Sequence, residues 1–171
     1  MTSRLAALTA LAVLSLLLPP APAKAACNVH IMATLPVTMQ GTRPLVEARI
    51  NGAPAMFMAD SGAFYSFISP GAAAQFHLHP VAAPFGMRVK GVGGSAELSV
   101  ADVRDFTLAG IPVPHAQFFV GGSETGGRAQ GIIGRNILSM ADVEYDLAGG
   151  AIRLLRTDGC RGASLAYWAK P

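Results

Sequence analysis

One carboxylate in an apolar stretch is the side chain that most needs an explanation. Asp60 follows the apolar residues 55–59 and precedes Ser61, Gly62 and Ala63, in the segment MFMADSGAFYSFIS. An ionised carboxylate inside a protein core costs several kcal/mol unless it is paired, hydrogen-bonded or protonated. The pattern therefore indicates a carboxylate whose charge is compensated, and acid–base chemistry is the first candidate for its role.

Histidines offer a second kind of chemistry, metal binding, with less support. His77 and His79 would share one face of a strand, but no third ligand is evident near them in the sequence. We interpret them, and His115 beside Pro114, as solvated loop residues. The sequence therefore predicts no metal site and no cofactor.

Two glycine-rich loops have the composition of phosphate-binding segments without the rest of the pattern. The loop from Gly122 to Gly127 is followed by Arg128 and Ala129, where a phosphate-binding loop needs a lysine and a hydroxyl residue. Residues 91–100 run into an alternating strand pattern, where a dinucleotide fingerprint needs a helix. Both comparisons argue against nucleotide binding.

Residues 1–26 have the pattern of a secretory signal peptide. Arg4 precedes an uncharged apolar run at residues 5–18, and residues 23–25 offer a small-x-small cleavage site. The run is shorter than the roughly 20 residues that a membrane-spanning helix needs, and prolines follow it at once. We predict an exported protein, periplasmic or secreted, with no stable membrane insertion after cleavage.

The two cysteines lie near the ends of the predicted mature chain. Cys27 and Cys160 are the only cysteines, and an even count in an exported chain favours one disulfide between them. The alternative is two unpaired thiols near the termini. A lipid anchor on Cys27 is a lesser alternative, because Lys24 stands where lipoprotein signals normally have leucine.

The charge of the mature chain is nearly balanced. Of the thirteen Lys and Arg residues, Arg4 and Lys24 lie in the leader, which leaves eleven basic against ten acidic side chains, a net charge of +1. Such a balance recruits neither nucleic acid nor an anionic membrane. We predict a single domain over residues 27–171, with its core at about 44–156.

Short strands and turns must position Asp60. Residues 45–50 alternate apolar and polar side chains, Asn51-Gly52 predicts a two-residue hairpin turn, and residues 55–59 form the next strand, which ends at Asp60. Further expected elements are a short helix that begins at Ser69 and Pro70, a hairpin at 87–100, a strand at 115–120 and a hairpin at 142–155. We therefore predict an all-β fold, a small closed β-barrel or sandwich with one or two short helices.

Three motifs, taken in order, resemble the retropepsin-like (retroviral-type) aspartic proteases. They are Asp-Ser-Gly-Ala at 60–63, Gly-Val-Gly-Gly at 91–94 and Gly-Ile-Ile-Gly-Arg-Asn-Ile-Leu at 131–138. The last string is the most specific, and the similarity runs from about residue 46 to residue 155. The resemblance implies the retropepsin-like fold and an aspartic endopeptidase, a homodimer that hydrolyses a polypeptide substrate.

The resemblance also implies roles for the first motif. Asp60 would be the catalytic carboxylate, one from each subunit, and the two would share a proton and activate a water. Ser61 would make a hydrogen bond across the subunits, and Ala63 would line the cleft. Gly62 would let the backbone approach a partner or substrate closely.

The other two motifs would cover and support that loop. Val92, Gly93 and Gly94 resemble the tip of a flap that closes over substrate and excludes water. The supporting residues of the last motif would pack beneath the Asp60 loop: Ile132, Ile133, Gly134 and Arg135.

Two features depart from the family pattern or extend it. Relatives commonly have an acidic residue after the first motif, paired with the arginine equivalent to Arg135, whereas Phe64 stands there in this chain. We therefore expect either that Arg135 pairs with another carboxylate, that of Asp142, Glu144 or Asp146, or that the contact between the two subunits differs from the family's. Residues 28–35 and 151–156 are candidates for the terminal strands that retroviral-type dimers interleave.

A non-catalytic peptide-binding or structural module with the same fold is the alternative interpretation. It would keep Asp60 as a compensated buried acid without a reaction. A monomeric chain would favour it, because a single carboxylate would then lack its partner.

Overall fold

The computed structural model describes residues 27–84, 89–91, 94–96, 98–122 and 127–161. These residues fall into two compact units, one of residues 29–157 and a small one made by residues 27–28 and 158–161. The predicted signal peptide lies outside the described residues, and the single-domain prediction stays a prediction. None of the helices within the described ranges has the length and apolar character that crossing a membrane requires.

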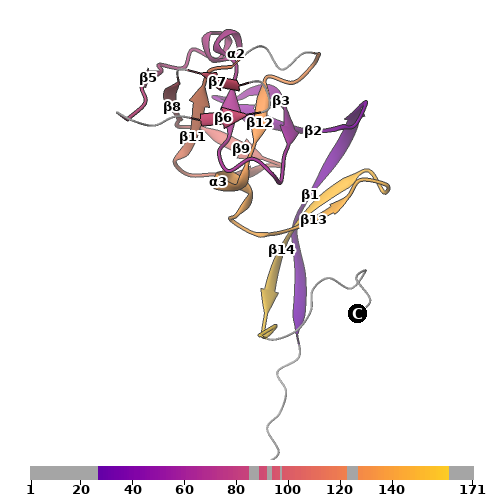
Figure 1. Ribbon diagram of the computed structural model, residues 1–171. Coiled ribbons are helices and arrows are strands. Elements are labelled where there is room, and N and C mark those ends of the chain that lie inside the picture. Colours follow the sequence, from indigo (N-terminus) through magenta and orange to yellow (C-terminus); the bar gives the residue numbers. More distant parts are fainter. Residues whose placement is uncertain (1–26, 85–88, 92–93, 97, 123–126, 162–171) are drawn as a thin grey trace, which may run out of the picture. The chain divides into compact units, whose positions relative to one another are not determined.

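Strands dominate the larger unit, as the sequence predicts (Figure 1). In chain order they are β1 (Asn28–Gln40), β2 (Arg43–Ile50), β3 (Ala53–Ala59), β4 (Phe67–Ile68), β5 (Val81–Ala82), β6 (Val89–Gly91), β7 (Gly94–Ala96), β8 (Ser99–Val103), β9 (Phe106–Leu108), β10 (Ile111–Pro112), β11 (Ala116–Val120), β12 (Gly131–Ile133), β13 (Asp142–Asp146) and β14 (Ala151–Asp158). The helices are α2 (Pro70–Gln75) and α3 (Arg135–Leu138). The predicted all-β class with short helices is confirmed.

The main sheet is open, so the predicted closed barrel is wrong. Its strands follow the path β13-β14-β1-β2-β3-β12-β4-β11-β8-β5, with β9 attached to β2 and β10 to β9. Within the described part of the chain, the two ends of this path do not pair. β1 pairs with β2 over Val37–Gln40, and β14 is its other neighbour in the sheet. The sheet is thereby extended through the terminal strands.

The hairpin that leads to Asp60 forms as its sequence predicts. β2 and β3 are antiparallel, and Ile50 lies opposite Ala53 across the turn. Asn51 and Gly52 have φ values of 50° and 79°. Both turn residues thus adopt the left-handed conformation that asparagine and glycine tolerate best, and that a two-residue hairpin turn of this type requires.

Three phenylalanines form the centre of the core. Phe57 on β3 is fully buried, and its ring centroid lies 6.1 Å from that of Phe106 and 5.4 Å from that of Phe118. Phe106 and Phe118 also contact each other edge to face. Because Phe57 lies three residues before Asp60, this cluster fixes the strand that delivers the carboxylate.

Of the predicted hairpin at 87–100, the structure describes residues 89–91, 94–96 and 98–100. β6 and β7 pair with Gly91 opposite Gly94, while Val92 and Gly93 lie outside the described residues. Val100 belongs to β8, which pairs with β11 and with β5. Its side chain is buried, and the strand therefore belongs to the main sheet and not to the β6–β7 hairpin.

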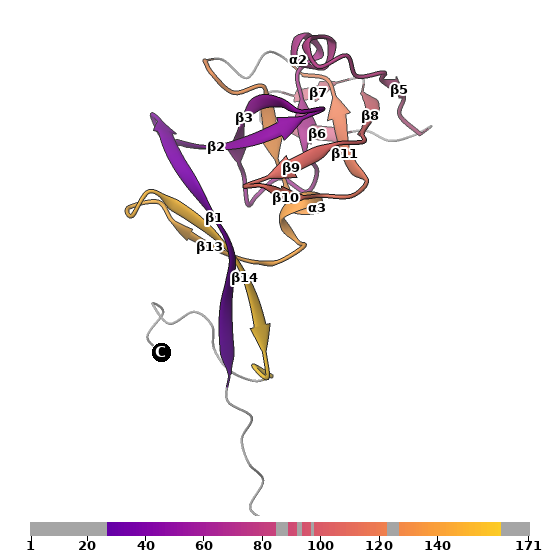
Figure 2. The same cartoon turned by 180° about the vertical axis from the view of Figure 1, so that it is seen from behind.

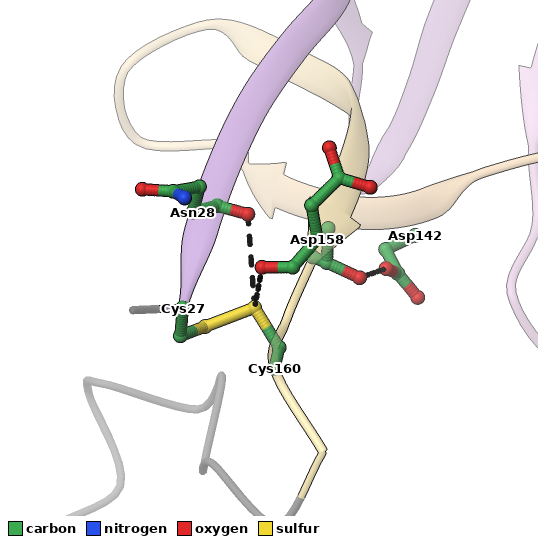
Figure 3. Close-up of a disulfide and its surroundings, with 6 residues drawn as sticks. Cys27, Asn28, Asp142, Asp158 and Cys160 are labelled. Carbon is green, nitrogen blue, oxygen red and sulfur yellow. Dashed lines mark hydrogen bonds between the residues drawn. A yellow bond between two sulfur atoms is a disulfide. The ribbon is translucent and has the colours of Figure 1, made fainter. Parts of the chain in front are cut away.

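A disulfide joins the residue before β1 to a residue after β14. The Sγ atoms of Cys27 and Cys160 are bonded across a sequence separation of 133 residues (Figure 3). The Cys160 sulfur also lies 3.6 Å from the Asn28 carbonyl oxygen and 3.4 Å from that of Asp158. The disulfide thus links the two chain segments that make up the small unit, residues 27–28 and 158–161.

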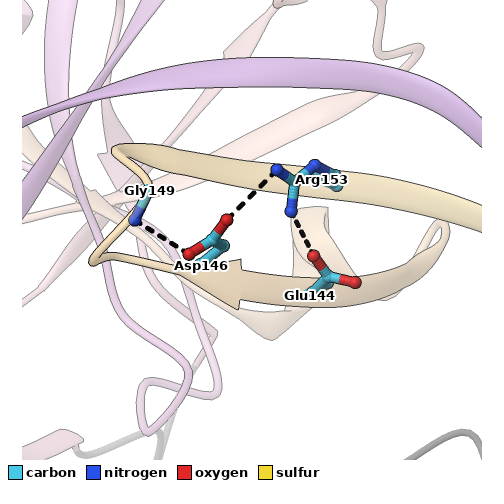
Figure 4. Close-up of polar contacts among 4 residues, drawn as sticks. All are labelled: Glu144, Asp146, Gly149 and Arg153. Carbon is cyan, nitrogen blue, oxygen red and sulfur yellow. Dashed lines mark hydrogen bonds and ion pairs between the residues drawn. The ribbon is translucent and has the colours of Figure 1, made fainter. Parts of the chain in front are cut away.

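The β13–β14 hairpin carries a group of charged side chains on one face (Figure 4). The Arg153 guanidinium binds the carboxylate of Glu144 and lies 3.1 Å from that of Asp146. Asp146 also accepts a hydrogen bond of 2.8 Å from the Gly149 N–H in the turn. The hydrogen bond from the Gly149 N–H lowers the pKa of Asp146 most, and the hydrogen bond from Arg153 lowers it further.

Truncation of Phe57 tests the core. We expect Phe57→Ala to lower the free energy of unfolding by about 3–5 kcal/mol, because it opens a cavity between two other rings. Urea denaturation of the purified chain measures the change. Leu147→Ala, at a partly exposed position in the terminal hairpin, is the control and should cost less than about 1 kcal/mol. Equal costs for the two variants would contradict the assigned centre.

The Asp146 carboxylate should make stability depend on pH. Since its folded-state pKa is lowered, its contribution is present above the unfolded pKa and is lost as the pH falls through the folded one. Asp146→Asn should therefore flatten the loss of stability between about pH 5 and pH 2. Urea midpoints across that range give the measurement, with the exposed Asp105→Asn as control. A variant with an unchanged slope would refute the assignment.

Candidate functional site

Asp60 comes directly after β3, at a point where β3 lies parallel to β12. Ala59 pairs with Ile133, and the Asp60 N–H donates a hydrogen bond of 3.0 Å to the Ile133 carbonyl oxygen. Ala59 and Ile133 are buried, whereas Asp60 itself is half-buried. The carboxylate thus leaves the core at the strand end and remains accessible to water.

The next residues fold back onto the Asp60 carboxylate. The Gly62 N–H donates a hydrogen bond of 2.8 Å to Oδ1 of Asp60, and the Ala63 N–H lies 3.3 Å from the Asp60 carbonyl oxygen. A Cβ on Gly62 would lie 3.3 Å from the same Oδ1. Glycine therefore lets the backbone amide reach the carboxylate without a side chain pressing against it.

The far end of this loop is held by the N-terminus of α3. The N–H groups of Arg135 and Asn136 donate to the carbonyl oxygens of Ala63 and Phe64 at 2.8 and 3.1 Å. A Cβ on Gly134 would lie 2.6 Å from the Tyr65 carbonyl oxygen. Only glycine fits there without displacing the loop, so the loop and the residues before α3 form one hydrogen-bonded unit.

A buried serine and an asparagine complete this unit, and the sequence analysis assigned neither. Ser66 is fully buried, and its Oγ accepts a hydrogen bond of 2.9 Å from the Gly134 N–H. Its hydroxyl and its N–H both donate to Oδ1 of Asn136 at 2.8 Å. The Asn136 amide in turn donates to the Gln117 carbonyl oxygen on β11. The available signal for the role of Ser66 was a small hydroxyl residue between two aromatic ones, Tyr65 and Phe67.

Arg135 meets an aromatic ring where a carboxylate was expected. Its guanidinium carbon lies 5.6 Å from the centroid of the Phe64 ring, a distance that permits a cation–π contact. The three expected partners form other contacts: Glu144 and Asp146 bind Arg153, and Asp142 accepts a hydrogen bond from Thr157. Phe64, which replaces the usual acidic residue, supplies the surface on which Arg135 packs.

Tyr145 on β13 is a second residue that the sequence analysis did not assign to the site. Its hydroxyl oxygen is buried and has no hydrogen-bond partner among the described residues. Burial, and after it the charge of Asp60, raise the pKa of the phenol. Tyr145 therefore stays neutral, with a polar hydroxyl in the electrostatic field of the Asp60 carboxylate. In the sequence, Tyr145 alternates with Val143 and Leu147 along one face of a strand, and this pattern predicted a packing role alone.

Other sequence candidates lie apart from this group or outside the described residues. Gly94 lies in β7, while Val92 and Gly93 are not described. Residues of the described ranges include no group of three or more His, Cys, Asp or Glu side chains that could hold a metal ion. His77 and His79 are exposed residues after α2.

The arrangement can perform acid–base chemistry through one carboxylate. Asp60 is half-buried, one of its oxygens accepts a backbone hydrogen bond, and neighbouring Ser61 and Gly62 are exposed. Beside it, Phe64 exposes 70% of its surface and Tyr65 44%.

Comparison with known proteins agrees with this geometry. Residues 46–137 match the family of aspartyl proteases. A retropepsin-like aspartic protease from Rickettsia conorii superposes with a TM-score of 0.52 at 13% identity, over 77% of this chain and 95% of its own. The retroviral protease-like domain of Ddi1 from Leishmania major gives 0.50 at 23% identity, over 66% and 90%. Both likenesses show a retropepsin-like fold; no curated protein sequence matches the chain.

Removal of the Ser66 hydroxyl tests the support of the loop. Ser66→Ala leaves the buried Gly134 N–H without its acceptor, so we expect a loss of about 1–3 kcal/mol in the free energy of unfolding. Ser139→Ala, an exposed serine at the end of α3, is the control and should change it by less than about 0.5 kcal/mol. A Ser66→Ala chain that unfolds at the wild-type urea concentration would contradict the role.

Proposed function

Because the chain belongs to the aspartyl protease family, we propose that it is an aspartic endopeptidase whose working form is a homodimer, with Asp60 contributed by each subunit. The observation that carries the proposal is the Asp60 loop. One half-buried carboxylate stands at a strand end, with its own backbone amide donor and a hydrogen-bonded support beneath it. A single chain supplies half of a two-carboxylate site.

Two Asp60 carboxylates brought within a few ångströms of each other share one proton, since both cannot ionise cheaply. The ionised one takes a proton from a water molecule, whose oxygen attacks the carbon of the scissile peptide carbonyl. The protonated one donates to the carbonyl oxygen, which gives a tetrahedral diol. Transfer of a proton to the peptide nitrogen then allows the carbon–nitrogen bond to break. The Gly62 amide keeps each carboxylate oriented during these steps.

The neighbouring residues take supporting roles in the proposal. Ser61, exposed beside Asp60, makes the hydrogen bond between the two subunits, and Ala63 lines the cleft. Val92, Gly93 and Gly94 close over an extended polypeptide, which main-chain hydrogen bonds hold in the manner of an added strand.

We also propose that the protein is exported and works in the periplasm or outside the cell. The leader pattern of residues 1–26 motivates this, and the Cys27–Cys160 disulfide supports it, because structural disulfides persist in oxidising compartments. The anchored alternative, a lipid on Cys27, is incompatible with a sulfur that is already in a disulfide.

Substitution of Asp60 tests the proposed activity. The mature wild-type chain should cleave peptides from a mixed library between about pH 4 and pH 7, with no effect of a metal chelator. Asp60→Asn and Asp60→Ala should each lower the rate by about 10²–10⁴-fold or more, because the acid–base group is gone. Mass spectrometry of the products over time gives the measurement.

The control separates chemistry from folding. Asp105→Asn, at an exposed position remote from the loop in sequence, should retain the wild-type rate. All variants should keep the wild-type circular dichroism spectrum. Equal cleavage by wild type and both Asp60 variants would end the assignment; a wild-type chain that binds peptides without cleaving them at any pH would favour the non-catalytic peptide-binding module.

A further inference from the structure

The Tyr145 hydroxyl is a buried polar group for which the proposed mechanism has no use. Its oxygen is shielded from solvent and has no hydrogen-bond partner among the described residues. A hydroxyl in that situation destabilises the folded chain, because it gives up its hydrogen bonds to water and gains none in return. Phenylalanine would fill the same space without this cost. A tyrosine at this position therefore indicates a role for the hydroxyl itself.

Strand geometry turns the Tyr145 ring toward the core. Side chains alternate along β13, and Glu144 and Asp146 point to the face on which they bind Arg153 (Figure 4). Tyr145 points to the other face, and Ile152, its partner across the hairpin on β14, is fully buried. In the sheet, β14 lies between β13 and β1 (Figure 2). The two carboxylates next to Tyr145 in the sequence are therefore not partners for its hydroxyl.

The core that receives this ring also carries the Asp60 loop. Tyr145 packs against the buried cluster that includes Ala59 and Ile133. Ala59 is the residue before Asp60, and the Ile133 carbonyl oxygen accepts the Asp60 N–H. Consistent with this placement, the charge of Asp60 adds to the effect of burial in raising the pKa of the phenol. The phenol is neutral, so its hydroxyl keeps the proton that a hydrogen-bond donor needs.

The Asp60 carboxylate has room for such a donor. An ionised carboxylate offers about four acceptor sites, and the described part of the chain fills one of them, with the Gly62 N–H. Acceptor sites therefore remain both for the reacting water and for a further donor. The Tyr145 hydroxyl lies beyond direct hydrogen-bonding distance of the carboxylate. One water molecule spans such a gap, and the hydroxyl and the carboxylate give it the two polar partners that a buried water requires.

We propose that Tyr145 is a positioning residue for Asp60: its hydroxyl donates to a bound water molecule, which in turn donates to the Asp60 carboxylate. The inference rests on the proposed function, in which this carboxylate is the acid–base group. Gly62 restrains the carboxylate from within its own loop, and Tyr145 restrains it from β13, a distant part of the chain. A carboxylate held by donors from two segments rotates less, and acid–base catalysis requires a fixed orientation of the catalytic group.

A role in packing alone is the competing interpretation of Tyr145, and removal of the hydroxyl distinguishes the two. Tyr145→Phe keeps the ring and its packing. In the bridged arrangement the substitution removes a hydrogen bond, so it should lower the urea midpoint of unfolding by about 0.5 M. With packing alone it removes an unpaired buried hydroxyl, so the midpoint stays or rises. The second result would overturn the inference.

A double-mutant cycle with Asp60→Ala identifies the partner of the hydroxyl. Urea midpoints are measured for the wild type, both single variants and the double variant of the mature chain, with the disulfide intact and at one chain concentration. Because the bridge needs the carboxylate, Tyr145→Phe should no longer lower the midpoint once residue 60 is alanine. Tyr65→Phe, which removes the hydroxyl of an exposed tyrosine after the same loop, is the matched control and should shift the midpoint equally in both backgrounds. Equal effects of Tyr145→Phe in both backgrounds would contradict the bridge.

Peptide cleavage by the same chains separates this inference from the proposed function. Tyr145→Phe should lower kcat about 10-fold and change KM less than about twofold, because it alters the orientation of the carboxylate and not the binding of substrate. A chain that cleaves peptides but shows no coupling in the cycle, or that keeps the wild-type kcat in Tyr145→Phe, overturns the inference while the protease assignment stands. Coupling in a wild-type chain that cleaves no peptide supports the hydrogen bond to Asp60 and overturns the proposed function instead.

Discussion

The site depends on the hydrogen-bonded unit between the Asp60 loop and the residues around Gly134. Ile133 receives the Asp60 N–H, α3 donates to Ala63 and Phe64, and the Ser66 hydroxyl links Gly134 to Asn136. Each of these contacts joins parts of the chain about seventy residues apart. Since a catalytic group must be held to within a fraction of an ångström, this support decides what the carboxylate can do.

The same loop also explains how an ionised Asp60 carboxylate is stabilised. The carboxylate lies at the end of the strand instead of inside it, so water reaches it. The Gly62 N–H stabilises the ionised form by a hydrogen bond. Burial, and after it the charge of Asp60, raise the pKa of the Tyr145 phenol. In the proposed dimer, a second carboxylate replaces part of that water, which is the condition for proton sharing.

The features that the sequence predicts correctly are those set by residues close together in the chain. The Asn51-Gly52 turn, the Ser69 cap and the β13–β14 hairpin depend on neighbouring residues, and all three form as expected. Sheet closure depends on whether β13 and β5, at the two ends of the strand path, meet each other, and pairing between strands so distant in sequence is encoded by no local pattern. Likewise, Ser66, Asn136 and Tyr145 acquire their roles through contacts with distant segments, and Arg135 packs on Phe64 because of the loop geometry. The motif identified the carboxylate, but the side chains that hold it become visible only in three dimensions.

Subunit mixing tests most directly whether two Asp60 carboxylates form one site. Wild-type chains and Asp60→Asn chains are mixed in varied proportions at constant total concentration, allowed to exchange subunits, and assayed for peptide cleavage. If both carboxylates are required, activity follows the square of the wild-type fraction, and an equal mixture retains about one quarter of the activity. A linear dependence, with about one half retained in the equal mixture, would mean that each chain acts alone and would contradict the account.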